Sequence, residues 1–173
     1  MSTSTPPPSS EVFVQGELDW IEKAAIENLK GRIATADILA KEAVTTLTVL
    51  LAGAGGGWAL GLKLFDEQAS TSAVAAFIAG AWLTILSMAL VWLCMKIDSI
   101  PAVYNQPREL LGRDAQGATF DQWRRYELNN IDDRIKDAVA RNDKVAVRLN
   151  WIRVLATLTP ILSGISAWIY RIT

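Results

Sequence analysis

The chain contains no histidine, and its single cysteine, Cys94, lies within an apolar segment. Histidine is the usual general acid or base near neutral pH, and histidine and cysteine are the usual ligands of structural zinc. Their absence excludes His-based acid–base catalysis, Cys/His metal sites and disulfides within the chain. We therefore predict a protein that is not an enzyme and holds no metal or cofactor, with Cys94 packed as a small hydrophobe.

Charged residues are missing from two long stretches in the first half of the chain. The first comprises 20 uncharged residues from 43 to 62, AVTTLTVLLAGAGGGWALGL, and the second runs from Gln68 to Met95. A helix needs about 20 apolar residues to cross the hydrocarbon core of a bilayer. Because only a short polar turn separates the two stretches, the sequence predicts a transmembrane hairpin over 43–96.

A third uncharged stretch, from Val154 to Tyr170, has 17 residues and is near the lower limit for a span. Within it, Pro160 lacks an amide N–H and is expected to kink the helix. We predict a third transmembrane helix over 154–173, and the alternative is a helix half-embedded in the membrane. No charged residue lies inside any of the three stretches, so the sequence offers no proton relay or coupled-transport site.

Lysine and arginine gather at one end of each predicted span. They precede the first and third spans and follow the second, whereas the hairpin turn offers only Lys63 and the tail only Arg171. By the positive-inside rule, the N-terminus and the segment 96–153 lie in the cytoplasm. We therefore predict a multi-pass protein of the inner (plasma) membrane, with the hairpin turn and the C-terminus outside.

The remaining segments are predicted to be cytoplasmic: a disordered lead, an amphipathic helix, a loop and a long helix over 1–15, 16–41, 97–118 and 119–153, respectively. In the amphipathic helix, apolar residues at spacings of three and four form one stripe: Ile26, Leu29, Ile33, Ala36 and Ala40. This stripe predicts packing against another cytoplasmic helix, with Trp20 and Ile21 in the contact. Thr119 and Gln122 have the spacing of a capping box at the start of the long helix.

The long helix carries a seam of residues that alternate at spacings of three and four: Leu128, Ile131, Ile135, Ala138, Asn142, Val145, Leu149 and Ile152. Such a seam predicts a coiled coil, in which a polar residue such as Asn142 fixes register and copy number. The same stripe also suits an intramolecular three-helix packing. The long helix is expected to run directly into the third span.

Glycines at 53, 57 and 61 lie on one face of the first span. Helices in lipid associate by close backbone contact at small residues. Gly53, Gly57 and Gly61 are therefore predicted to pack helix against helix between copies of the chain in a homo-oligomer. In the second span, small residues recur at 76, 80 and 84, which predicts that the two helices of the hairpin also cross closely.

A basic stripe is the candidate ligand site. It comprises Arg134, Arg141 and Arg148, spaced seven residues apart, together with Lys144. In an oligomer these side chains would form positive rings that suit a nucleotide or a short single-stranded oligonucleotide. The alternative is ordinary positive-inside flanking, with the charges solvated or paired along the helix.

An amphipathic cytoplasmic helix, a Gly/Ala-rich hairpin and a long charged helix together resemble the small membrane effectors of bacterial anti-phage defence. These are the SLATT-like and related proteins of two to four spans, which are encoded beside nucleotidyltransferases. The resemblance rests on the glycines from Gly53 to Gly61, on Trp20 and on the stripe from Arg134 to Arg148; the third span departs from the two-span pattern. It implies an oligomeric pore that depolarises the inner membrane when a nucleotide signal changes, with a nucleotidyltransferase as the partner that makes the signal.

Two other classes of membrane protein fit the same sequence. A holin-like or toxin-like protein would permeabilise the membrane without a ligand. A structural scaffold would oligomerise in the bilayer without conducting ions.

Overall fold

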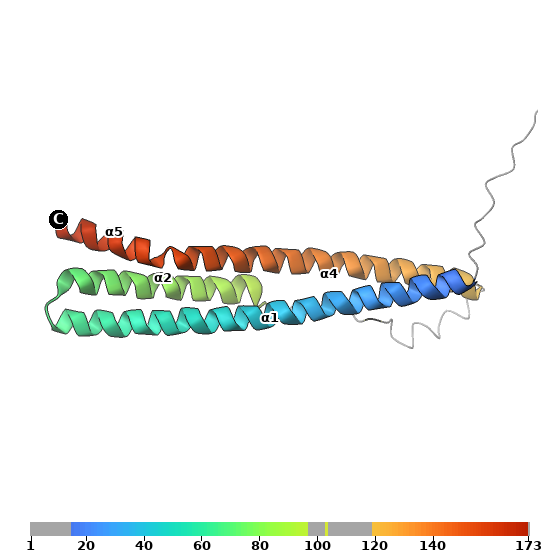
Figure 1. The fold of residues 1–173 in the computed structure, drawn as a ribbon, viewed down its shortest axis with the longest axis horizontal. Coiled ribbons are helices and arrows are strands. Elements are labelled where there is room, and N and C mark those ends of the chain that lie inside the picture. Colours follow the sequence, from blue (N-terminus) through green and yellow to red (C-terminus); the bar gives the residue numbers. More distant parts are fainter. Residues whose placement is uncertain (1–14, 97–102, 104–118, 173) are drawn as a thin grey trace, which may run out of the picture. The chain divides into compact units, whose positions relative to one another are not determined.

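The computed structural model describes residues 15–96, 103 and 119–172. In that part of the chain four helices are present, α1 (Gln15–Asp66), α2 (Ser70–Cys94), α4 (Phe120–Thr157) and α5 (Thr159–Ile172) (Figure 1). Three helical stretches, 16–66, 70–94 and 120–172, are long and apolar enough to cross a membrane. Within the described residues, the prediction of a helical chain with three stretches able to span a membrane is confirmed. Residues 1–14 of the predicted lead at 1–15, and all of the predicted loop at 97–118 except Val103, lie outside the described residues; Gln15 is the first residue of α1.

α1 is a single helix of 52 residues. It contains the predicted cytoplasmic helix and the first span without a break between them, because no proline interrupts residues 15–66. Its C-terminus closes in a Schellman turn, in which the Ala69 and Gln68 amides donate to the Leu64 and Phe65 carbonyls at 3.0 and 3.1 Å. Gln68 takes the left-handed conformation that this turn requires, with φ 58°. α2 follows directly, so the first two spans form the predicted tight hairpin.

The chain divides into two compact units. The first contains residues 1–33 and 101–138, and the second contains 34–100 and 139–173. In the first unit, the buried apolar residues are Leu18 and Leu29 of α1 and Ile131 and Ala138 of α4. Leu29, in the predicted apolar stripe, is thus buried as that stripe predicts. Trp20 is 72% exposed, so the prediction that it packs between helices is wrong for the single chain.

Polar contacts complete the first unit. Arg124 of α4 donates hydrogen bonds to Glu22 at 2.8 Å and to Asp19, both on α1. The bond to Glu22, followed by the bond to Asp19, raises the pKa of Arg124 above its ordinary value, so this cation stays charged. The predicted capping box at the start of α4 is confirmed, since the Thr119 amide donates to Gln122 Oε1 at 3.0 Å and the Gln122 amide donates to Thr119 Oγ1 at 3.4 Å.

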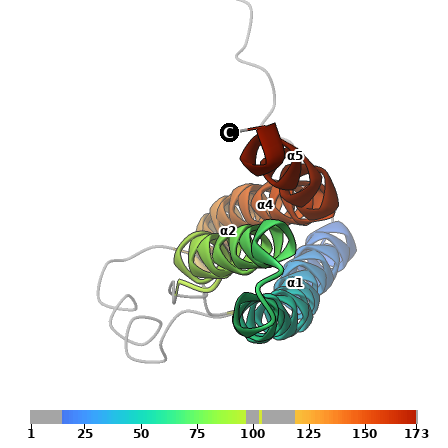
Figure 2. The same cartoon turned by 90° about the vertical axis from the view of Figure 1, so that its left-hand side faces the viewer.

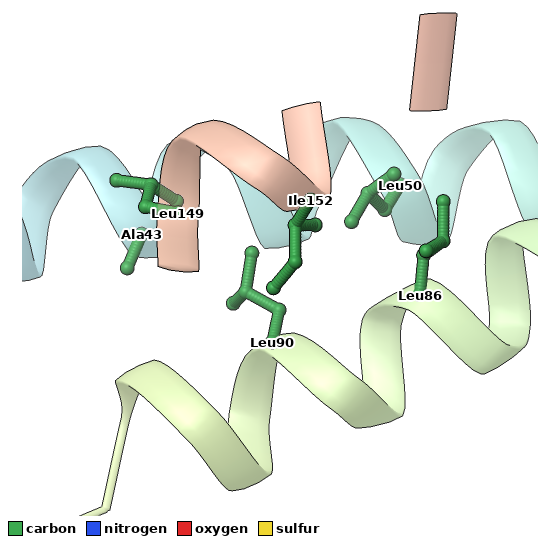
Figure 3. Close-up of a cluster of buried hydrophobic side chains, with 6 residues drawn as sticks. All are labelled: Ala43, Leu50, Leu86, Leu90, Leu149 and Ile152. Carbon is green, nitrogen blue, oxygen red and sulfur yellow. The ribbon is translucent and has the colours of Figure 1, made fainter. Parts of the chain in front are cut away.

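The second unit has a core built from three helices. Its buried residues come from α1, α2 and α4: Ala43, Leu50, Leu86, Leu90, Leu149 and Ile152 (Figure 3). Two of them, Leu149 and Ile152, belong to the predicted seam. Asn142, also a seam residue, is only 7% exposed and interacts with another group of the same chain. The seam therefore packs intramolecularly, which was the alternative to a coiled coil between copies. A role of Asn142 in setting copy number stays a prediction.

The third span is broken. α4 ends at Thr157 and α5 begins at Thr159, with Leu158 in a turn between them. Pro160 thus falls in the first turn of α5, where its missing N–H costs least. The predicted kink at Pro160 is confirmed, and the prediction of a helix that runs unbroken into the third span holds only as far as Thr157. In the end view, α5 lies beside α2 (Figure 2).

Candidate functional site

The glycine face of α1 contacts α2 of the same chain. A Cβ built on Gly57 would lie 2.8 Å from both the Cα and the amide nitrogen of Gly80. On Gly53 and Gly61, a Cβ would lie 2.8 Å from side-chain carbons of Leu83 and Phe77. The close crossing of the hairpin helices is therefore confirmed. The prediction that this face joins copies of the chain is replaced by an intramolecular contact, because α2 fills the groove.

Aromatic residues flank this crossing. Trp58 donates its Nε1–H to Thr84 Oγ1 at 3.3 Å, and its ring lies 5.7 Å from that of Phe77, centroid to centroid. Thr84 Oγ1 in turn donates to the Gly80 carbonyl at 2.8 Å. The indole N–H and the hydroxyl, both inside apolar stretches, are thus satisfied within the hairpin, which is what a lipid environment would require.

The opposite face of α1 is open. Small or hydroxyl-bearing residues line it through the span, and all are exposed in the chain: Thr45, Thr48, Ala52, Gly55, Gly56 and Ala59. A Cβ added to Gly55 or Gly56 would meet nothing within 4 Å. We call these six residues the outer face of α1. Exposed apolar side chains flank it, among them Val49, Leu51 and Leu60.

One end of the second unit is held by an arginine clamp. Arg153 of α4 pairs with Glu42 of α1, and its Nε and Nη2 donate to Thr46 Oγ1 at 3.1 and 3.0 Å. Both charged groups lie at the ends of uncharged stretches. The Arg153 side chain is 44% exposed and the Glu42 side chain 52% exposed. An ion pair this exposed adds little to the stability of the fold, so its main effect is to align α4 with α1 along their length.

Exposed aromatic side chains mark both ends of the apolar stretches. Trp92, near the end of α2, is 81% exposed, and Trp151, two residues before Arg153, is 62% exposed. At the other end, Trp168 and Tyr170 of α5 are also exposed. Tryptophan and tyrosine are enriched at the two water interfaces of a bilayer, because a ring suits the hydrocarbon edge and its polar atom suits the headgroups. Their positions support a membrane setting for the second unit.

The predicted basic stripe is divided between the two units. Arg134 belongs to the first unit, where its Nη1 donates to the Val103 carbonyl at 3.2 Å and lies 3.7 Å from Glu127 Oε1. Arg148 belongs to the second, where its Nη1 donates to the Leu93 carbonyl at 3.0 Å. α2 has no basic residue in its own last turn, so Arg148 caps its negative end from another helix.

Arg141 and Lys144 are the two stripe residues that remain available. They lie within one turn of α4 in the second unit; Arg141 is partly buried and Lys144 is exposed. Within the described ranges, neither is engaged in an ion pair with a carboxylate. The candidate ligand site is therefore reduced from four cations to this pair. In the described part of the chain, no group of acidic, histidine or cysteine side chains could hold a metal ion.

Several long-range contacts were not predicted from the sequence. Among them are the bonds of Arg153 to Thr46, of Arg148 to the end of α2, and of the Trp82 indole of α2 to the Leu155 carbonyl of α4. Each joins residues more than 50 positions apart, so no local spacing indicates it. The single available signal was Arg153 at the edge of an uncharged stretch. Comparison with known protein families, with curated proteins and with solved structures found no match to this chain.

Proposed function

We propose that the protein is a homo-oligomeric, non-enzymatic membrane effector whose copies assemble into an ion-conducting pore. The observation that carries this proposal is the outer face of α1. A single chain leaves six small or hydroxyl-bearing residues uncovered along a span, between apolar flanks. Such a face suits contact with another copy or with water better than contact with lipid.

A ring of copies with this face inward would line a lumen with threonine hydroxyls and glycine backbone. The hydroxyls of Thr45 and Thr48 donate to the carbonyls of Lys41 and Val44 at 3.0 Å, and each hydroxyl oxygen can still accept a hydrogen bond. The apolar residues that flank the face would remain in contact with neighbouring copies or with lipid. No charged residue is needed in such a pore.

The biological role that fits this proposal is the one implied by the resemblance to SLATT-like effectors: depolarisation of the inner membrane in anti-phage defence. A nucleotide or short oligonucleotide made by a partner nucleotidyltransferase would supply the signal. Purified protein in liposomes should dissipate an imposed potassium gradient, and mass measurement of the detergent-solubilised complex should give several copies. A monomer that passes no ions would contradict the pore. An oligomer without flux would support the scaffold instead.

We further propose that the N-terminus and residues 96–153 are cytoplasmic and that the hairpin turn and C-terminus are outside, as the lysine and arginine distribution favours. In a Cys94→Ala background, single cysteines at Ser4 and Gln116 should resist a membrane-impermeant thiol reagent added to intact cells. A cysteine at Ser70, an exposed position in the first turn of α2, should react. Labelling of Gln116→Cys from outside would overturn this topology.

The ligand-dependent part of the proposal rests on Arg141 and Lys144. The variant Arg141→Glu/Lys144→Glu should lose binding of short single-stranded oligonucleotides, and flux should lose its response to them. Wild-type binding should weaken steeply with added salt, because each phosphate contact releases counterions. Arg124→Glu is a poor control because Arg124 holds the first unit together; Lys136→Glu, on the exposed side of α4 beside Asp132 and Asp133, is the matched one.

The Lys136→Glu control should bind like the wild type. Equal binding by the double variant and the wild type would mean that Arg141 and Lys144 are ordinary positive charges at the cytoplasmic end of a span and do not bind the ligand. Flux that needs no ligand in any variant would favour the holin-like class.

A further inference from the structure

The break between α4 and α5 frees several backbone carbonyls, and side chains take over their hydrogen bonds. Pro160 has no N–H to offer the Ala156 carbonyl, and the Thr159 hydroxyl donates to that carbonyl instead, at 2.7 Å. The Val154 carbonyl accepts from the Thr157 hydroxyl at 2.7 Å. In lipid these replacements are needed, because water cannot satisfy a carbonyl at this depth.

The Leu155 carbonyl has a different partner, on another helix. It accepts the amide of Leu158 at 3.2 Å in a tight turn, and it also accepts the indole N–H of Trp82 from α2 at 3.2 Å. In an unbroken helix this carbonyl would accept the amide of Thr159. The Trp82 indole and the Thr159 amide therefore compete for the Leu155 carbonyl. The bond from Trp82 favours the bent arrangement over a straight helix.

The two sides of the break are held very differently. On the α4 side, Leu149 and Ile152 are buried in the core of the second unit, and Arg153 is clamped to α1. On the α5 side, no residue of Thr159–Ile172 is buried. α5 packs against α2, and the hydroxyls of Ser163 and Ser166 are satisfied by carbonyls of the same chain segment, at 2.9 and 2.8 Å.

We propose that Leu158 is a hinge on which α5 changes its angle to α2, and that the Trp82 indole stabilises the bent arrangement. The anchored end of α4 stays in place while α5 moves as a rigid helix of 14 residues. The proposal concerns the shape of one chain, so its test needs no conductance and does not depend on the pore.

The test measures distances between paired spin labels in lipid nanodiscs, in a Cys94→Ala background. One pair, at Ser72 of α2 and Ile172 of α5, reports on the angle across the hinge. A second pair, at Met88 of α2 and Val154 of α4, reports on the anchored side. All four positions are exposed, so the labels displace no core residue.

Trp82→Phe keeps an aromatic ring and removes the N–H donor. The Ser72–Ile172 distances that differ from the distance in the bent arrangement should become roughly threefold more populated. This is the effect typical of losing one interhelical hydrogen bond in a membrane protein. The Met88–Val154 distribution should not change. Trp92→Phe, on the same helix at an 81% exposed position, should match the parent protein in both pairs.

Pro160→Ala tests the hinge from the other side, because it restores the N–H that the Ala156 carbonyl lacks. It should shift the Ser72–Ile172 distance and narrow its distribution as α4 and α5 join. Superimposable distributions for Trp82→Phe and the parent would overturn the proposal. Equal broadening of both label pairs would also overturn it, because that result means general loosening rather than motion about Leu158.

Discussion

Gly57→Leu is expected to destabilise the transmembrane hairpin strongly. Even the first carbon of the new side chain would lie 2.8 Å from Gly80 Cα and from the Gly80 amide nitrogen, and the Ala76 carbonyl would follow at 3.1 Å. These are backbone atoms, which cannot turn aside as a side chain can. The helices must separate, which also breaks the bond from Trp58 to Thr84. The cost should be at least about 3 kcal/mol, at the upper end for overpacking.

The variant Gly55→Leu, on the outer face of α1, is the matched control. It makes the same change in helix propensity, but a Cβ on Gly55 meets nothing within 4 Å. The measurement is thermal unfolding in detergent, followed by tryptophan fluorescence. The protein is kept dilute, because association between copies would raise the Tm. We expect a large fall in Tm for Gly57→Leu and little change for Gly55→Leu. Equal falls in the two variants would mean that the packing of α1 on α2 does not depend on the contact at Gly57.

Cysteines on the outer face of α1 should make the proposed pore sensitive to thiol reagents. In a Cys94→Ala background, Thr48→Cys or Ala52→Cys should conduct normally and then lose most of its ion flux when a positively charged methanethiosulfonate is added. The physical reason is that a cation tethered in a narrow lumen obstructs the path and repels other cations. The measurement is potassium flux from liposomes before and after the reagent.

Leu51→Cys is the control for that experiment. Leu51 neighbours Ala52 in the sequence and is 53% exposed, but it lies on an apolar flank of the outer face. Its cysteine should leave flux unchanged, either because lipid shields the thiol or because the modified side chain lies outside the lumen. Block at Leu51→Cys with no block at Thr48→Cys or Ala52→Cys would mean that another face of α1 lines the path.

Local patterns in the sequence were enough to predict the helices of this protein. The length of the uncharged stretches set the three candidate spans, because crossing a bilayer is a matter of length and polarity along one helix. The kink at Pro160 and the capping box at Thr119 depend on groups only three or four residues apart, so they were also readable. The close crossing of the hairpin followed from small residues at 76, 80 and 84 of the second span, because a short turn joins the two helices.

The sequence did not show which partner each helix face contacts. A glycine face and an apolar seam suit a second copy as well as a neighbouring helix, because the same small or apolar side chains serve both contacts. Only the tertiary structure decided that Gly57 meets Gly80 and that Leu149 and Ile152 pack into the core of their own chain. The basic stripe was reduced for the same reason, since its periodicity showed neither the α2 terminus that Arg148 caps nor the Val103 carbonyl that Arg134 binds. By itself the sequence determined where the helices form, which depends on neighbours along the chain; the partners of their faces depend on residues far apart, and only the tertiary structure decided those.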